Sequence, residues 1–517
     1  MSARSLASMD AVDVVVAGAG PTGLTLACGL LLHGVSVRVV DRAPGPSVTS
    51  PANFLHARGS EVLDRIGALG TLPDESLRAM RVTTYLGDHP IMNLQFGDPG
   101  LRTAAPPMLV SQAKIENALR NRLAELGVAP EWNRRLTALT PDRDGVTAAL
   151  GSGRAVRARW LVGCDGTGST TRSLTGIGFP GVKLSERFLL ADVHLDWDMD
   201  RSGTTGWIHP KGLIGVMPMP DPHGRNDLWR VIAYDPGGDE KPSEEQIFDR
   251  LSRILPTRTH RTVRIGDPVW LSQFSVHRRL ADSYRRGRIL LAGDAAHAHS
   301  PFGGQGMLTG IGDAENLAWK LALVVTSRAT DRLIDSYEAE RRPLATEVLR
   351  GTSTITRVNV ASHPLGRLVR DRIVVRLFGL AAVQRWATYS ASQLWVSYRK
   401  GPLGGRGRKP RPGDRIGDLP CVREDGAASR LHAELGGRWA LLTPRGADVV
   451  GTDGVRNRLG GHLGVLSYDG KDAMLVRPDA HLAWRADPKD ARALDRWLAA
   501  ALDTGRVRQP RRRTHQR

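Results

Sequence analysis

Three glycine-centred motifs, far apart in the chain, carry residue types that are suited to gripping a dinucleotide. They are residues 18–23 (Gly-Ala-Gly-Pro-Thr-Gly), 163–166 (Gly-Cys-Asp-Gly) and 293–297 (Gly-Asp-Ala-Ala-His). In the first, Gly18 permits a tight turn, Gly20 lets the backbone approach a pyrophosphate, and Gly23 lets a helix pack closely on a strand. The N–H groups that begin this helix would offer hydrogen bonds and a partial positive charge to phosphates.

An acidic residue accompanies each motif, and its position suggests a hydroxyl group as its partner. Asp41 lies about 20 residues beyond the first glycines, where a carboxylate can accept hydrogen bonds from a ribose diol. Asp165, with Arg172 after it, supplies a turn and a cation near the same nucleotide site, and Asp294 could bind the ribityl hydroxyls of a flavin. An NAD-dependent dehydrogenase needs only the first motif, so the two later motifs favour FAD over NAD.

A further glycine cluster, residues 303–306, opens the next predicted helix. The N–H groups at the start of this helix would face the pyrimidine edge of the isoalloxazine ring. Preorganised donors there would stabilise the negative charge that the ring acquires on reduction. The sequence therefore predicts that distant loops converge on one FAD molecule.

The motifs must be positioned by secondary structure, and a short apolar run precedes every one of them. The runs are residues 14–16, 160–162 and 289–291. Continuous apolar runs of this length are typical of buried parallel strands. A helix over 24–32 and a strand over 35–39 complete a βαβ unit, so the chain leaves a nucleotide-binding domain and returns to it twice.

The middle of the chain has a different pattern. Residues 187–276 show no long helical period, and Trp207, Trp229 and Trp270 stand in short alternating segments. This pattern predicts a mostly antiparallel sheet that could wall a substrate cavity and exclude water. Further on, residues 412–502 read as a compact unit with a buried strand at 439–442 and a closing helix.

Bulk properties restrict the class of protein. A chain of 517 residues is long enough for roughly three domains. The sequence contains no uncharged apolar stretch of about 18 residues. We therefore predict neither secretion nor a membrane span. Cys28, Cys164 and Cys421 are widely separated, which argues against a disulfide framework and favours the cytoplasm. We expect no metal site, and either a monomer or a homodimer.

The formal net charge of +19 raises a hypothesis from another class, a polyanion-binding protein with an inert nucleotide fold. Much of this charge, however, lies in residues 399–415 and 506–517, which are rich in Gly, Pro or polar residues. Such stretches are typical of a linker and a disordered end. We therefore predict no nucleic-acid partner and keep polyanion binding as the alternative.

With these motifs in this order, the chain resembles the FAD-dependent aromatic hydroxylases. These are single-component flavoprotein monooxygenases of the para-hydroxybenzoate hydroxylase type, and the polyketide hydroxylases of actinobacterial antibiotic biosynthesis are the most similar group. The resemblance extends to residues 313–317 (Asp-Ala-Glu-Asn-Leu) after the third motif. Arg58, in a His-Ala-Arg element, resembles an arginine-bearing flavin contact, and Gln112 matches a glutamine that touches the flavin nucleotide.

The sequence departs from the family at two places. Pro51 stands where an arginine is frequent, and Met307-Leu308 replaces a pair that ends in asparagine. The C-terminal unit resembles the thioredoxin-like domain appended to many such hydroxylases, with residues 475–479 as its most recognisable piece. Redox activity there would need a Cys-x-x-Cys pair. Cys421 stands alone, so we predict a structural domain that could aid dimerisation.

The patterns and the resemblance together predict an α/β fold with a discontinuous Rossmann-like FAD-binding domain. The predicted parts are the FAD-binding domain (11–180 and 278–398, with 82–110 contributing to the substrate side), a mostly antiparallel substrate-binding sheet domain (181–277), a basic linker (399–411), a thioredoxin-like domain (412–503) and a disordered basic tail (504–517). The candidate cofactor-binding residues are Gly18, Gly20, Pro21, Thr22, Gly23, Asp41, Arg42, Arg58, Gln112, Asp165, Gly293, Asp294, Pro301, Gly304, Gly306, Met307 and Leu308. Asp165 and Arg172 are also candidates for contact with NAD(P)H.

The resemblance implies an enzyme in which NADPH or NADH reduces FAD and O₂ then forms a flavin hydroperoxide that hydroxylates an aromatic or polyketide-type substrate. The same scaffold could instead perform Baeyer–Villiger oxygen insertion. The sequence shows no second nucleotide fingerprint, so NAD(P)H would visit only transiently. No catalytic base is assigned. His194, His209 and Arg230 are candidates for assisting the deprotonation of a phenol, and His297 is expected to order its loop.

Overall fold

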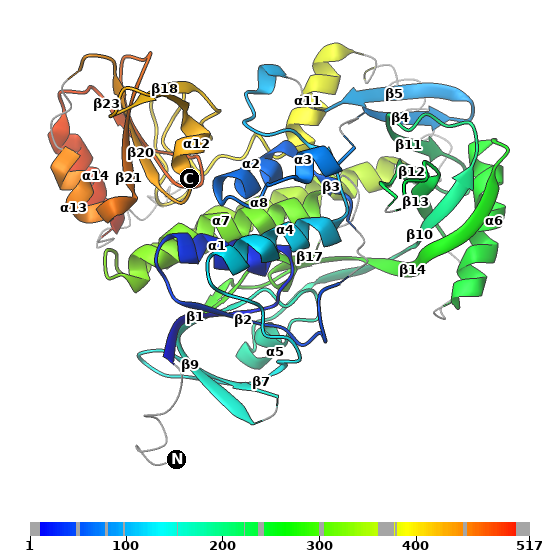
Figure 1. The fold of residues 1–517 in the computed structure, drawn as a ribbon, viewed down its shortest axis with the longest axis horizontal. Coiled ribbons are helices and arrows are strands. Elements are labelled where there is room, and N and C mark those ends of the chain that lie inside the picture. Colours follow the sequence, from blue (N-terminus) through cyan, green and yellow to red (C-terminus); the bar gives the residue numbers. More distant parts are fainter. Residues whose placement is uncertain are drawn as a thin grey trace, which may run out of the picture.

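The computed structural model places the nucleotide-binding part at the centre, between an antiparallel sheet and a smaller C-terminal domain (Figure 1). It describes residues 11–47, 52–77, 81–96, 99–151, 153–221, 223–235, 242–298, 304–359, 377, 380–447 and 452–502. Pro51, Pro301 and the tail 504–517 lie outside these ranges. Among the described helices, none combines the length and the apolar character needed to cross a membrane.

A seven-stranded sheet with parallel central strands forms the nucleotide-binding part. Its strands are β1 (Ala11–Ala17), β2 (Val37–Val40), β7 (Leu136–Pro141), β8 (Val146–Leu150), β9 (Arg154–Gly163), β15 (Arg285–Arg286) and β16 (Ile289–Leu291). The order is β15-β16-β9-β1-β2, and β8 joins β7 to β9. β1 is parallel to both β2 and β9, and β9 is parallel to β16. The three predicted apolar runs therefore lie side by side, which confirms the returning chain.

Helices cover this sheet and bury its apolar residues. They are α1 (Pro21–Leu32), α2 (Ala57–Arg65), α3 (Leu72–Glu75), α4 (Gln112–Glu125), α5 (Thr170–Thr175), α7 (Gln305–Val325) and α8 (Arg332–Asn359). α7 packs against α1, α2 and α8 and is buried along most of its length. Because α7 is surrounded by other elements on several sides, its sequence is apolar around most of its circumference.

An eight-stranded sheet forms the second layer. Its strands are β4 (Arg81–Leu86), β5 (His89–Gln95), β10 (Gly181–Asp196), β11 (Gly203–Ile208), β12 (Ile214–Pro218), β13 (Leu228–Tyr234), β14 (Arg264–Leu280) and β17 (His297–Ala298). The order is β17-β14-β10-β13-β12-β11-β4-β5, and only the β11–β4 pair is parallel among these neighbours. The predicted antiparallel sheet is thus confirmed. Residues 81–95 join it, and β17 ties it to the third glycine motif.

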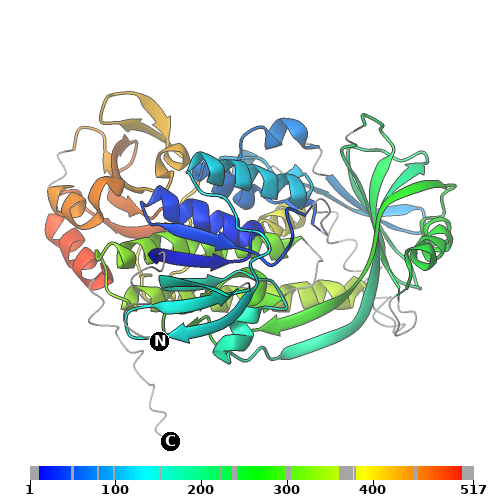
Figure 2. The ribbon, with the colours of Figure 1, turned by 60° about the horizontal axis from the view of Figure 1, so that its bottom comes forward.

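Helix α6 (Glu244–Thr259) covers one face of this sheet, the face that points away from the nucleotide-binding part (Figure 2). Trp207 and Trp229 pack in one hydrophobic cluster with Ile247, Leu251 and Leu255 of α6. These tryptophans therefore stabilise the sheet under α6. Because side chains alternate along a strand, the neighbours of these residues point to the opposite, inner face.

The C-terminal domain has the thioredoxin-like topology that the resemblance implied. Its elements are β18 (Pro420–Arg423), β19 (Ala428–Arg430), α12 (Leu431–Leu435), β20 (Trp439–Pro444), α13 (Thr452–Leu459), β21 (Leu463–Tyr468), β22 (Ala473–Val476), β23 (Leu482–Ala486) and α14 (Ala491–Leu502). β20 and β21 are parallel and flank α13, whereas β22 and β23 are antiparallel. The part of the chain that the structure describes also contains a ribbon of β3 (Phe54–Leu55) with β6 (Met108–Leu109), and helix α11 (Ala381–Ala391).

The recognisable piece of this domain, residues 475–479, lies at its junction with the nucleotide-binding part. Arg477 donates hydrogen bonds to both carboxylate oxygens of Glu340 on α8, at 2.8 and 2.9 Å. Lys320 of α7 donates to the same carboxylate at 2.7 Å, and all three side chains are buried. Burial alone would raise the pKa of Glu340, but Arg477 and Lys320 lower it to about 2. The C-terminal domain therefore supplies a counter-charge to the interior of its neighbour.

Candidate functional site

The three glycine motifs meet where the parallel strands end. Gly18 has a φ of 112°, and a Cβ built on it would lie 2.3 Å from the carbonyl oxygen of Cys164 in the second motif. Gly293 of the third motif has a φ of 61°, and a Cβ there would lie 2.5 Å from Oγ1 of Thr22. Only glycine permits such close backbone approach. The predicted convergence of the three loops is therefore present in the structure.

Some glycines of these motifs are uncrowded, as a close approach by a dinucleotide would require. A Cβ built on Gly20, Gly166 or Gly306 would meet no protein atom within 4 Å, although their motifs are closely packed elsewhere. Gly20 is the N-cap of α1, Pro21 occupies its first turn, and no side chain caps it. The N–H groups of that turn are thus left to an external acceptor such as a phosphate. The residues present therefore fit the binding of an FAD pyrophosphate at the start of α1.

Asp41 lies at the end of β2, next to the first motif. It accepts hydrogen bonds from the backbone N–H groups of Ala19 and Ala43, at 2.7 and 2.8 Å. Each carboxylate oxygen keeps a second acceptor site, so a ribose contact remains open to it. Gln112 begins α4 nearby and donates to Glu116 at 2.7 Å. Burial raises the pKa of Glu116, and the charge of Asp41 adds to this rise, so Asp41 and the start of α4 are near enough to interact.

Asp165 and Arg172 have internal partners. Asp165 accepts from the hydroxyl of Ser169 at 2.5 Å and from the backbone N–H of Thr171 at 2.9 Å, so it fixes the start of α5. Arg172 donates to the carbonyl oxygen of Ala295 at 2.8 Å. The second motif thereby supports the third. Contact of either side chain with NAD(P)H stays a prediction.

Asp294 is accessible within an enclosed part of the molecule. Its side chain is exposed, while its neighbours Gly293 and Ala295 are fully buried. Enclosure by the surrounding protein nevertheless raises the pKa of the Asp294 carboxyl. The exposed side chain is therefore within reach of a ligand at the junction of the three loops, where it could bind ligand hydroxyls.

A buried carboxylate on α7 holds the loop that carries Asp294. Asp313 accepts hydrogen bonds from the backbone N–H of Gly293 at 3.0 Å and from Nε2 of His297 at 2.5 Å. Arg341 of α8 donates to its other oxygen at 2.6 Å. Burial alone would raise the pKa of Asp313, but His297 and Arg341 lower it to about 2. His297 therefore orders the loop, as the sequence predicts.

Sequence reasoning missed Arg341 and Tyr398 as supports of this site. Arg341 also donates to the Tyr398 hydroxyl and to the carbonyl oxygen of Thr309, both at 2.8 Å. It lies in a helix with several charged neighbours, and nothing in that pattern distinguishes it. Asp313 could have been found, because it belongs to the 313–317 segment that resembles the hydroxylases.

The start of α7 lies beside the His-Ala-Arg element. Gly304 is the N-cap with a φ of 60°, and a Cβ on it would lie 3.4 Å from Cβ of Phe54 and 3.7 Å from Nε2 of His56. In the first turn, Met307 is partly exposed and Leu308 is buried. The structure therefore brings the predicted ring-binding helix end and the 54–58 segment together.

Arg58 and Arg42 occupy very different surroundings. Arg42 is exposed beyond β2, whereas Arg58 is only 3% exposed at the start of α2. Burial lowers the pKa of Arg58, and interactions with Tyr398 and Glu315 oppose that change. Arg58 thus lies toward the C-terminal domain, and its flavin contact stays a prediction.

The inner face of the eight-stranded sheet forms a wall toward the nucleotide-binding part. Gly206, Gly215 and Ile232 on this face are partly exposed. A Cβ on Gly215 would meet no atom within 4 Å. Asn53, which immediately precedes β3, donates to the sulfur of Met219 at 3.4 Å, and this contact connects the wall to the flavin side. Part of the inner face is therefore left uncovered.

The three candidate bases differ in position. His209 lies on the α6 side of the sheet, with its ring 6.2 Å from that of His260. His194 contacts Asp227 at 2.8 Å and Arg225 at 2.6 Å. His194, Asp221 and Asp227 also place possible metal-ligand atoms within 4.8 Å of one another. Arg225, however, pairs with Asp221, and Asp227 contacts His194, so these carboxylates already have partners. Arg230 lies on the inner face, and so does His194, because its strand neighbours Val193 and Leu195 pack on the α6 side.

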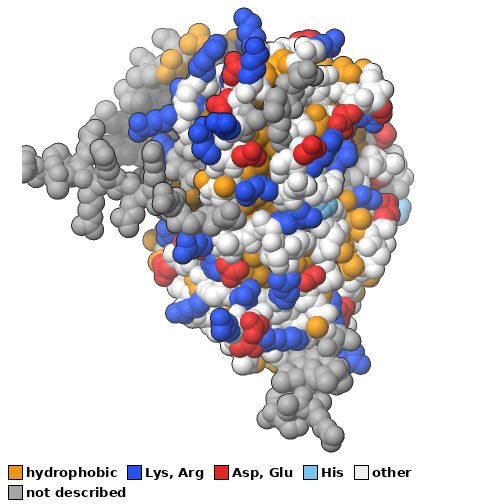
Figure 3. All heavy atoms as spheres, turned by 90° about the vertical axis from the view of Figure 1, so that its left-hand side faces the viewer, with side chains coloured by type: hydrophobic (Ala, Val, Ile, Leu, Met, Phe, Trp, Pro, Cys, Tyr) orange, Lys and Arg blue, Asp and Glu red, His pale blue; other side chains and the backbone are white. Residues whose placement is uncertain are grey.

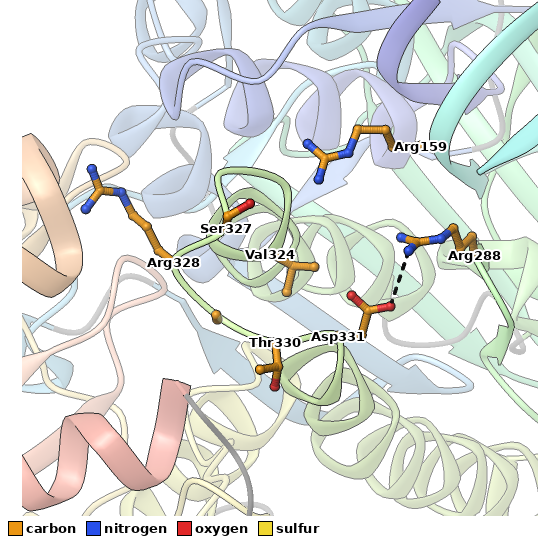
Figure 4. A pocket seen from close by; sticks show the side chains of 8 residues that line it. Arg159, Arg288, Val324, Ser327, Arg328, Thr330 and Asp331 are labelled. Atoms are coloured by element: carbon orange, nitrogen blue, oxygen red, sulfur yellow. Dashed lines mark ion pairs between the residues drawn. The ribbon is translucent and has the colours of Figure 1, made fainter. Parts of the chain in front are cut away.

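A polar pocket of about 280 Å³ lies at the opposite edge of the parallel sheet (Figure 4). One of its residues, Arg288, precedes β16, whereas the third motif follows β16. Arg159 donates to the carbonyl oxygen of Val325 at 2.6 Å, and Arg328 donates to two carbonyls of α13 at 3.3 and 3.4 Å. These internal contacts leave the pocket without a clear ligand.

The face formed by the C-terminal domain mixes charges of both signs. Figure 3 shows Lys and Arg side chains interspersed with Asp and Glu. Arg456 pairs with Glu424 at 2.6 Å, and Arg445 pairs with Asp469 at 2.8 Å. Such pairing is typical of an ordinary solvated surface.

Comparison with known proteins gives two family matches and close relatives along nearly the whole chain. Residues 11–352 match the family described as "FAD binding domain", and residues 409–504 match "Aromatic-ring hydroxylase, C-terminal". The chain is 35% identical over 457 residues to 6-methylpretetramide 4-monooxygenase of Streptomyces rimosus, covering 84% of this chain and 79% of the relative. It is 32% identical over 496 residues to dialkyldecalin synthase of Streptomyces rugosporus, covering 94% and 99%. The solved structure of an anhydrotetracycline hydroxylase from Streptomyces rimosus superimposes with a TM-score of 0.79 at 31% identity, covering 95% and 99%.

Proposed function

This chain belongs to the FAD-dependent aromatic-ring monooxygenases, and on that premise we propose that it hydroxylates a polycyclic aromatic or polyketide-type compound with NAD(P)H and O₂. The observation that carries the proposal is the convergence of three glycine motifs, with uncrowded glycines and the exposed side chain of Asp294 at their junction. The names of the relatives support the substrate class, since they include enzymes that act on pretetramide and anhydrotetracycline.

Each part of the site has a role in this proposal. The start of α1 binds the pyrophosphate, Asp41 orients a ribose, and Asp294 holds the ribityl hydroxyls. N–H groups at the start of α7 stabilise negative charge on the ring, because they are fixed before the reaction. When bound, FAD would supply the redox chemistry, in which NAD(P)H gives up a hydride, one oxygen atom of O₂ enters the substrate and the other leaves as water. The sheet domain keeps water away from that reaction.

The proposal is tested by purification and turnover. We expect a yellow protein that contains FAD, and NADPH or NADH oxidation that is stimulated by some members of a panel of phenols and aromatic polyketides. Products should gain the mass of one oxygen. Comparison of the two donors at equal concentration decides between NADPH and NADH. A colourless protein that takes up no FAD would refute the proposal.

A ring-forming function is a second candidate, because one relative that matches nearly the full chain is named dialkyldecalin synthase. In that case product would form without NAD(P)H and without a gain in mass. Baeyer–Villiger insertion, the third outcome, would also add one oxygen but would convert a ketone into an ester or lactone. Product structures therefore separate the three.

The proposed partner is a small molecule, and the proposed location is the cytoplasm, with a monomer or homodimer as the assembly. The polyanion alternative rests on the net charge of +19 alone. Binding to nucleic acid driven by phosphate contacts falls steeply with salt. A mobility shift that persists at physiological salt, and is lost on deletion of residues 506–517, would favour that alternative.

A further inference from the structure

Arg230 stands out on the inner face of the eight-stranded sheet. Its side chain is fully buried, with 1% of the residue exposed. Nε and Nη2 donate to the two carboxylate oxygens of Asp192 on the neighbouring strand, at 2.7 and 2.6 Å. This two-point pairing fixes the plane of the guanidinium group. The third nitrogen, Nη1, is directed away from Asp192.

Nη1 of Arg230 has no acceptor. It is buried, and among the residues that the structure describes none accepts a hydrogen bond from it. A guanidinium nitrogen of this kind carries two N–H donors, and burying them unsatisfied is costly. Native proteins satisfy such groups with an ordered water or a ligand. The site is thus built for an oxygen that the chain itself does not provide.

The position of Arg230 identifies what that oxygen would belong to. Its strand neighbour on β12 is Met217, and Met219, two residues further on, contacts Asn53 beside β3. Phe54 of β3 lies against Gly304 at the start of α7. Arg230 therefore lies on a part of the wall that is connected, through β12 and Asn53, to the segment where the ring of FAD is proposed.

The surface next to Arg230 is open and largely apolar. Ile232, two residues along β13, and its strand partner Gly215 are both partly exposed. The Arg230 guanidinium lies 5.6 Å from the ring centroid of Trp270. A flat hydrophobic ligand against this wall would present its edge to Nη1. Because Asp192 already neutralises Arg230, the accepting oxygen needs no negative charge.

We propose that Arg230 is a substrate-binding residue whose Nη1 donates a hydrogen bond to a keto or phenolic oxygen of a polycyclic substrate. The inference rests on the proposed function and makes it more specific, because it requires a ring oxygen at the edge that faces β13. Asp192 acts as a positioning residue that holds the guanidinium plane. An aromatic hydrocarbon without such an oxygen would lack this contact.

Two soluble probes with the same ring skeleton test the inference. Anthraquinone-2-sulfonate carries keto oxygens, and anthracene-2-sulfonate does not. Their dissociation constants are measured by equilibrium dialysis with the FAD-loaded protein and, in parallel, with the protein as freed of flavin. We expect the wild type to prefer the quinone by at least about tenfold, the size expected for one good hydrogen bond from a charged donor.

Arg230→Lys keeps a cation beside Asp192 and removes the fixed Nη1 donor, so it should reduce the preference to below about threefold while affinity for the hydrocarbon stays within about twofold. The double variant Asp192→Leu with Arg230→Met removes both charges together, which avoids an unpaired buried carboxylate. It should show the same loss. Arg258→Lys is the matched control, because Arg258 is a buried arginine on the α6 side that donates to the carbonyl oxygen of Tyr234 at 2.5 Å.

The inference is overturned if the wild type shows no preference, or if the preference survives both Arg230 variants. If a variant fails to fold, the wild-type preference and the remaining variant decide. Failure of the proposed function is a separate result, since it would appear as absent FAD uptake or absent product. Dialysis of the flavin-free protein reads the Arg230 contact in either case.

Discussion

Replacing Asp313 by asparagine is the sharpest test of how the flavin loop is held. The carboxylate of Asp313 receives three hydrogen bonds, from Gly293, His297 and Arg341, and all of these groups are buried. An amide has the same shape, but one of its two ends donates where the carboxylate accepted. Arg341 would then be left without its anion. Breaking a buried ion pair from one side costs about 3–5 kcal/mol, and we expect the free energy of unfolding to fall by that amount.

The effect on FAD follows from one of these bonds. A hydrogen bond to a charged acceptor contributes about 1.5–3 kcal/mol, so the bond from Gly293 sets an upper limit on the cost of reordering the loop. At 1.4 kcal/mol for each factor of ten, the dissociation constant for FAD should rise by up to about 10- to 150-fold. Asp294 is still present in this variant. The increase in the dissociation constant for FAD would therefore reflect a change in the position of Asp294.

The assay is fluorescence titration of the flavin-free protein with FAD, together with urea unfolding. Asp335→Asn is the control, because Asp335 pairs with Arg285 at 2.7 Å but its side chain is 65% exposed. An exposed pair is worth less than about 1 kcal/mol, and FAD affinity should stay within about twofold of wild type. A folded Asp313→Asn variant with wild-type affinity for FAD would show that Asp313 does not hold the loop.

Three further predictions concern other parts of the molecule. Gly20→Val should leave unfolding by urea nearly unchanged, since a Cβ there meets no protein atom. It should weaken FAD binding at least about tenfold, because the pyrophosphate approaches that backbone. Unchanged FAD affinity would contradict this prediction. Glu340 has a pKa of about 2 in the folded protein against 4.5 as its ordinary value, because Arg477 and Lys320 outweigh its burial. As the pH falls, the unfolded chain therefore takes up the proton first. Up to about 3 kcal/mol of stability, fully present above about pH 5, should be lost as the pH falls toward 2. The free energy of unfolding in urea should depend less steeply on pH for Glu340→Gln than for wild type, and an identical pH dependence would refute the assignment. Burial raises the pKa of the Cys421 thiol to about 11, so Cys421→Ser and thiol reagents should leave turnover unchanged, and a fivefold loss would reveal a redox role.

Much of the nucleotide-binding part could be read from local pattern. Each apolar run before a glycine motif is a strand because continuous β-branched and aliphatic residues suit a sheet that is covered on both faces. Gly18 and Gly293 could be singled out because a turn and a close backbone approach exclude every other residue there. The order of the motifs along the chain was enough to predict that β9 and β16 return to the sheet of β1, in which β9 lies between β1 and β16.

Some predictions needed information that alternation along a strand does not contain. The pattern indicates that Trp207 and Trp229 share a face of their sheet, but whether α6 or the nucleotide-binding part covers that face depends on how the layers pack. The same ambiguity left His209 and Arg230 as equal candidates. Packing separates them, because it places His209 beside His260 of the α6 side and Arg230 on the inner face.

By itself, then, the sequence determined the elements whose residues act through near neighbours: strands, turns that require glycine, and helix ends that bind phosphate. The tertiary structure alone decided which buried charges meet. Arg341 reaches Asp313 across 28 positions, and Arg477 reaches Glu340 across 137. No local preference marks these residues, because an isolated charge in a helix or strand looks like a solvated one. Their pairing becomes visible only when burial removes the water that would otherwise satisfy them.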